Sequence, residues 1–98
     1  MTGLNLKTNS TDISVFKKIV ANGISGERKK IEYALNKSLE IIQKYEKEYN
    51  MSSEDFSQRF HKNEIEENGA TFEWWAELKL ARELEEKLNL VDSIEICQ

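Results

Sequence analysis

The sequence SGERKKIEYALNKSLEIIQKYEKEY, residues 25–49, determines how the rest of the chain is arranged. At 100° per residue, its apolar side chains fall on one side of an α-helix and most of its charged side chains on the other. The apolar side carries Ile31, Ala34, Leu35, Ser38, Ile41, Ile42, Tyr45 and Tyr49. Ser25 is a suitable N-cap after Gly23, and Asn50 tolerates the left-handed conformation that follows many helix ends. The stretch therefore predicts one long helix whose apolar face must be covered by other segments.

The composition predicts one small domain without a membrane span. The chain has 98 residues, of which 39% are hydrophobic and 33% charged, and it has no proline, which suits long helices. We find neither a signal peptide nor a segment as long as a membrane span. The single cysteine, Cys97, excludes a disulfide framework and favours a reducing cytoplasm. Residues 1–11 are polar and are predicted to form a disordered tail, whereas residues 12–98 are predicted to form a single domain.

The two ends of that domain are ambiguous. Residues 12–20 (DISVFKKIV) fit both a strand and a helix, and their β-branched side chains slightly favour a strand. Residues 21–24 are predicted to turn into the long helix. Residues 90–97 (LVDSIEIC) fit a short strand or a tail that pairs with residues 13–20. The sequence leaves open whether short strands edge the domain.

Two further helices follow the long one. Ser52 is predicted to cap a short helix over residues 53–61, with Asp55 as the acidic partner of the cap. Phe56 and Phe60 share one face of this helix, four residues apart, and would fold back near the end of the long helix.

An acidic loop over residues 62–70 leads to a third helix, predicted over residues 72–89 with Thr71 as its cap. Its apolar side carries Trp74, Leu78, Ala81, Leu84 and Leu88, whereas Phe72 and Trp75 point away from it. Glu77 lies inside the apolar arc and needs a partner there. The fold class predicted is mainly α: a long central helix, a short helix and a second long helix.

Residues suited to catalysis or metal binding do not cluster in the sequence. His61 is the only histidine and has no cysteine near it, so we predict no zinc site. The carboxylates of the acidic loop have nothing nearby to separate their pKa values, which favours a solvated charge run over acid–base chemistry. We therefore predict that the protein is not an enzyme and uses no cofactor.

The third helix carries the best candidate binding residues. Trp75 shares its side with Lys79 and Arg82, and a tryptophan on a polar face is typical of an interaction surface. Such a surface would be buried either in a homodimer or against another protein. The predicted partner-binding residues are Phe72, Trp75, Lys79, Arg82, Glu64, Glu66 and Glu67.

The charges are divided unevenly between the two halves of the chain. Residues 1–45 have eight Lys or Arg and four Asp or Glu, giving +4, whereas residues 46–98 have six and fourteen, giving −8. The candidate nucleic-acid contacts are Lys17, Lys18, Arg28, Lys29 and Lys30. Ordinary solvation of helix faces explains the same charges, and we favour it for so small a domain.

Several short motifs resemble a family of small prokaryotic antitoxin-like proteins. They are Tyr49-Asn50-Met51-Ser52, Asp55-Phe56, Arg59-Phe60 and, after the acidic loop, Phe72-Glu73-Trp74-Trp75-Ala76. The resemblance covers residues 28–85; the family has a glycine in place of Asn50 and a different acidic loop. Members are often encoded beside small toxins, many of them basic nucleases.

The resemblance implies a non-catalytic, cytoplasmic protein that neutralises a basic toxin with an acidic and aromatic surface, which fits the division of charge. The alternatives are a small protein that binds nucleic acid or takes part in transcription, and a structural homodimer subunit.

Overall fold

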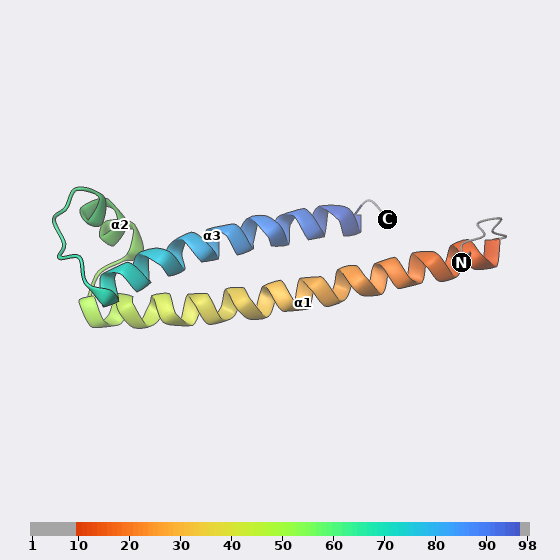
Figure 1. The fold of residues 1–98 in the computed structure, drawn as a ribbon, viewed down its shortest axis with the longest axis horizontal. Helices are drawn as coiled ribbons and strands as arrows, with labels where there is room; N and C mark the ends of the chain where they lie inside the picture. The colour runs from red at the N-terminus through yellow and green to blue at the C-terminus, as the bar shows by residue number, and fades with distance from the viewer. Residues whose placement is uncertain (1–9, 97–98) are drawn as a thin grey trace.

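The protein is a rod built from two long antiparallel helices and one short helix. A computed structural model describes residues 10–96. Its elements are α1 (Ser10–Tyr49), α2 (Ser53–His61) and α3 (Gly69–Ile96). Figure 1 shows that α3 folds back along α1, that α2 lies at the end where the chain reverses, and that the amino-terminal end of α1 extends beyond the end of α3. The molecule measures 64 × 25 × 19 Å. The predicted class, with a long, a short and a long helix, is confirmed.

Helix α1 begins at Ser10 and not after Ser25, so it is sixteen residues longer at its start than predicted. Residues 12–20 are helical and form no strand, and Gly23 lies inside the helix without breaking it. Glycine costs about 1 kcal/mol relative to alanine inside a helix, whereas ending the helix would leave several backbone groups without partners. Of the predicted disordered tail, residues 1–9 lie outside the described residues, and Ser10 and Thr11 belong to α1.

Helix α3 is also longer than predicted, at both ends. It begins at Gly69, and residues 90–96 continue it in place of the predicted strand or tail. Thr71 is not its cap: the Thr71 amide donates to Asn68 Oδ1 at 3.0 Å, and the Asn68 amide donates to Thr71 Oγ1 at 2.9 Å. This reciprocal pair satisfies two amides at the helix start, so Asn68 is the capping residue and Thr71 its partner inside the first turn.

Asparagine residues in the left-handed conformation end both α1 and α2. Asn50 has a φ of 51° and Asn63 a φ of 58°. At the end of α1, the amide of Met51 donates to the carbonyl oxygen of Glu46 at 3.1 Å. At the end of α2, the amide of Glu64 donates to the carbonyl oxygen of Arg59 at 2.8 Å. These bonds, which span five residues, are typical of helix ends that close on a left-handed residue. The prediction for Asn50 is confirmed, and Asn63 repeats it.

The apolar faces predicted for the long helices are the faces that meet. The α1–α3 seam is made of buried residues of both helices: Ile31, Leu35, Ser38, Ile42 and Tyr45 of α1 and Trp74, Ala81 and Leu84 of α3. A hydrogen bond from Ser38 explains how the charged side chain of Glu77 can lie on the apolar side of α3. The Ser38 hydroxyl lies 2.7 Å from a carboxylate oxygen of Glu77 and 3.0 Å from its carbonyl oxygen, so the polar atoms satisfy one another.

Trp74 is the residue on which all three helices meet. Its ring is fully buried and stacks on Phe56 of α2 with 3.8 Å between ring centres, and on Tyr45 of α1 with 5.9 Å. Its indole N–H donates to Ser53 Oγ at 3.0 Å. Ser52 caps α2 as predicted, since its hydroxyl accepts from the amide of Asp55 at 3.1 Å. Trp74 thus holds α2 against the helical pair.

Tyr45 makes the stability of this end of the seam sensitive to alkaline pH. Its hydroxyl donates to the Glu73 carboxylate, and this bond, with burial and the charges of Glu73 and Glu48, raises the pKa of Tyr45 to about 12. The unfolded chain ionises near 10, so the neutral hydroxyl is favoured by folding; this contribution is complete below pH 10 and is lost as the pH rises through 12. We expect denaturant unfolding to show a steep loss of stability between pH 10 and 12. Tyr45→Phe should flatten that loss, and an equally steep loss in Tyr45→Phe would refute this assignment.

Candidate functional site

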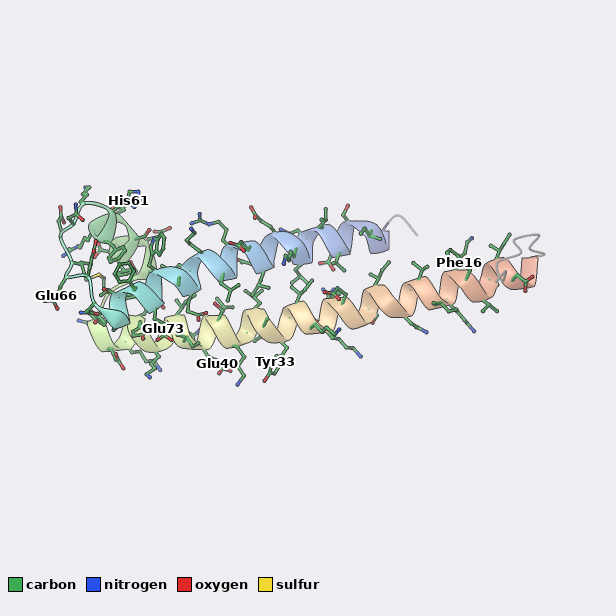
Figure 2. All side chains as sticks on the ribbon, viewed as in Figure 1. Phe16, Tyr33, Glu40, His61, Glu66 and Glu73 are labelled. Atoms are coloured by element: carbon green, nitrogen blue, oxygen red, sulfur yellow. The ribbon has the colours of Figure 1, made fainter. Side chains whose placement is uncertain are left out.

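The predicted partner-binding residues other than Arg82 lie toward the α2 end of the rod. The loop between α2 and α3 closes this end, where Figure 2 labels Glu66 and His61. Phe60 of α2 connects the two predicted binding aromatics of α3: its ring centre lies 5.9 Å from that of Phe72, edge to face, and 6.3 Å from that of Trp75. Aromatic rings held in this way keep one conformation, which lowers the entropy lost on binding a partner.

The structure separates the roles of the two aromatics. Phe72 is 49% exposed, as expected of a contact residue. Trp75 is only partly exposed, because it packs against the core and the ammonium of Lys79 lies 4.6 Å from its ring centre. The sequence predicted a polar face for Trp75, and Lys79 does lie beside it, but the ring also packs against the core, which the sequence did not predict. The sequence analysis assumed that only one side of α3 is covered, by α1. In the structure, α2 covers a second side of α3, where Phe60 lies against Trp75.

The three carboxylates of the acidic loop all face solvent. Glu64, Glu66 and Glu67 are exposed, while Ile65 between them turns inward and packs against the core. The backbone carbonyl of Glu66 accepts from the Thr71 hydroxyl at 2.9 Å, which anchors the loop to the start of α3. The loop thus presents negative charge from a fixed backbone, next to the aromatic cluster. We call Phe72, Trp75, Glu64, Glu66 and Glu67 together the acidic-aromatic end.

Arg82 lies apart from this end, on a groove that the sequence did not reveal. The groove has a volume of about 700 Å³ and runs between all three helices. Leu39, Ile42, Leu78 and Ala81 supply its apolar lining, and Arg82, Glu46, Glu54 and Glu85 supply its charges. Leu39 was the available sequence clue, because it is an apolar residue outside the main stripe of α1. The groove is largely open to solvent, which suits a protein segment better than a small molecule.

The predicted nucleic-acid contacts do not form one patch. Lys17, Lys18, Lys29 and Lys30 are exposed, but they point in several directions around α1. Arg28 is half-buried and belongs to the fold: its Nε lies 2.7 Å from Asp92 of α3, and its terminal nitrogen lies 2.9 Å from Glu32. Arg28 therefore ties the end of α3 to α1. A helix that scatters its cations in this way offers no continuous track for a phosphate backbone.

The amino-terminal part of α1 presents a second exposed surface, and it is apolar. We call residues 10–23 the arm. Ile13, Val15, Phe16, Ile19 and Val20 are between 40% and 67% exposed there. Such a cluster of apolar side chains on a charged rod is typical of an interaction surface.

No helix in the described range 10–96 is long and apolar enough to cross a membrane. Within the same range, no three His, Cys, Asp or Glu side chains converge as a metal site would require. Comparisons of this chain with protein-family models, with curated proteins and with solved structures found no match. The antitoxin-like family therefore stays a prediction from the motifs.

Proposed function

We propose that the protein is a non-catalytic protein-binding module, antitoxin-like, whose acidic-aromatic end neutralises a basic partner. The observation that carries this proposal is Phe72, a large side chain that is 49% exposed, packs edge to face on Phe60, and stands in the first turn of α3 directly after a loop with three exposed carboxylates. A half-exposed aromatic with its neighbours already in place is typical of residues that dominate binding energy. The motif resemblance supports the antitoxin-like class and a cytoplasmic location.

The acidic loop would act mainly on the rate of encounter. Three carboxylates on one loop produce a local negative potential, and basic proteins that bind RNA carry the complementary charge. Carboxylates at the rim of an interface steer the partner during approach, while the buried centre determines how slowly it leaves. Phe72, with Trp75 behind it, would form that centre. An acidic surface of this kind can occupy a nuclease site in place of phosphates.

Charge reversal of the loop tests this division of roles. Changing Glu64, Glu66 and Glu67 to lysine should slow association with the basic partner at low salt by at least about tenfold and change dissociation far less. The measurement is the association rate at rising salt, with the product of the neighbouring gene as the partner. Lysine substitutions at Glu40, Glu83 and Glu86, all exposed along the rod, provide the matched control with the same change of net charge. Association rates that change neither with salt concentration nor with reversal of the loop charges would contradict the proposal.

Nucleic-acid binding is the first alternative, and the exposed lysines of α1 are the only observation that favours it. Size-exclusion chromatography with and without RNA and duplex DNA separates it from the proposal, since co-elution at physiological salt would favour this alternative. The second alternative, a structural homodimer subunit, assigns no role to the acidic-aromatic end.

A further inference from the structure

The groove between the three helices is separate from the acidic-aromatic end, because none of the residues that define that end lines it. Its floor is apolar and comes from the two long helices, with Leu39 and Ile42 in α1 and Leu78 and Ala81 in α3. Ile42 and Ala81 are buried in the seam, whereas Leu39 is 39% exposed and Leu78 is partly exposed. The floor is therefore the outer surface of the core, and Leu39 is its most accessible apolar side chain.

Helix α2 forms the wall of the groove and shows which kind of element packs on this side of the rod. It lies at the end where the chain reverses (Figure 1), and it buries Phe56 completely against Trp74. Its first amide, at Ser53, donates to a carboxylate oxygen of Glu46 in α1 at 3.0 Å. The two long helices thus already hold one short helix beside the groove, as ridges and grooves of packed helices allow.

The length of the groove matches a further short helix. Glu46 marks the end of the groove at α2, and Leu39 lies seven residues earlier in α1. Seven residues correspond to about two helical turns, or roughly 10 Å. A helix that presents apolar side chains at positions i, i+3 or i+4, and i+7 places three of them within this length.

The charges of the groove specify the chemistry of its occupant. Its charged lining residues are three glutamates and one arginine, which gives a formal charge of −2: Glu46, Glu54, Glu85 and Arg82. Within residues 10–96, none of the four makes an ion pair. Glu46 is oriented by the Ser53 amide, and Glu54 and Glu85 are exposed at the rim. Carboxylates around an apolar floor are complementary to a segment that carries both apolar and cationic side chains.

We propose that the groove binds a basic amphipathic helix of a partner protein. The apolar face of that helix packs on Leu39 and Leu78, and its lysine or arginine side chains lie beside the glutamates of the rim. Burial of the apolar face supplies the binding energy, and the rim charges exclude acidic helices of the same shape. This site uses neither Phe72 nor the acidic loop, so it does not rest on the function proposed above.

A synthetic peptide tests the chemistry of the site on the full chain. The probe is a fluorescein-labelled helix of about 14 residues, with leucine on one face, lysine at the flanking positions and alanine elsewhere. Fluorescence anisotropy at low salt should show saturable binding that weakens as salt is added. The matched peptide has glutamate at each lysine position, and we expect its dissociation constant to be at least about tenfold higher.

Substitution of the floor tests the location. Leu39→Gln should raise the dissociation constant of the basic peptide at least about fivefold, because it removes the accessible apolar contact. The matched control is Leu90→Gln, the same change at an exposed leucine of α3 that does not line the groove. Both positions are outside the buried core, and equal urea midpoints would show that both variants remain folded.

Neutralisation of the rim tests the charge. Glu54→Gln combined with Glu85→Gln should weaken binding at low salt at least about fivefold and should have little effect at high salt. Glu40→Gln combined with Glu83→Gln makes the same change of net charge at exposed positions outside the groove, and should change binding far less.

Four outcomes would overturn the proposal. The first is no saturable binding up to several hundred micromolar, and the second is equal binding of the basic and acidic peptides. The third is binding that Leu39→Gln leaves unchanged but that reversal of Glu64, Glu66 and Glu67 abolishes, which would place the peptide at the acidic-aromatic end. The fourth is a dimer in sedimentation equilibrium that Leu39→Gln dissociates, which would assign the groove to a second copy of this chain.

Discussion

Trp74→Ala is expected to lower the free energy of unfolding by about 3–5 kcal/mol, the largest effect of any substitution considered for this chain. The indole is fully buried and stacks on rings from α1 and α2, so its removal opens a cavity where all three helices meet. It also removes the donor to Ser53 Oγ. A core this small has few other contacts with which to compensate. Urea denaturation followed by circular dichroism measures the loss.

Trp75→Ala is the matched comparison, because it removes the same side chain from the next position. Trp75 is partly exposed and contacts Phe60 and the Lys79 ammonium, so its loss should cost less than half as much. A tryptophan that faced only solvent would contribute little to folding, and the contact of Trp75 with Phe60 is the reason to expect a measurable loss. If Trp75→Ala unfolded the chain while Trp74→Ala spared it, the orientation of α3 and the proposed binding end would both be wrong.

Ile42→Ala should be the most costly substitution in α1, at about 2–5 kcal/mol. Ile42 is 5% exposed in the middle of the seam, where α1 and α3 depend mainly on each other for burial. Lys37→Ala is the control on the exposed side of the same helix. Its ammonium lies 5.7 Å from the ring centre of Tyr33, an exposed contact worth at most about 1 kcal/mol. Urea melts at one protein concentration compare the two, and indistinguishable melts would refute the assignment of faces.

The sequence predicted correctly those parts of the fold in which the local conformational preference of a residue agrees with its tertiary contacts. The stripe from Ile31 to Tyr49, the Ser52 cap and the left-handed Asn50 each combine a local preference with a place in the tertiary structure, and the structure confirms them. The start of α1 was predicted wrongly because Gly23 and the β-branched residues before it locally disfavour a helix. The helical spacing of Ile13, Phe16 and Val20 nevertheless continues the pattern of the long helix.

The candidate site was predictable in its position but not in its details. Exposed carboxylates in the loop and an exposed Phe72 could be inferred from composition and spacing. The partial burial of Trp75 could not, because it depends on where α2 packs. Arg28 was similarly misread as a surface cation, since its partner Asp92 lies 64 residues away and comes within reach only when α3 extends past residue 90.

Gly23 and Gly26 divide α1 into two units of unequal local stability, although its ribbon is continuous. Each glycine lowers the helical preference by about 1 kcal/mol relative to alanine, and both lie a few residues before Arg28, which pairs with Asp92 near the end of α3. We therefore expect the arm to unfold locally in the isolated chain without disturbing Ile31 or any residue beyond it. Backbone amides of the arm should exchange with solvent through this local unfolding, whereas amides in the seam should exchange only on global unfolding.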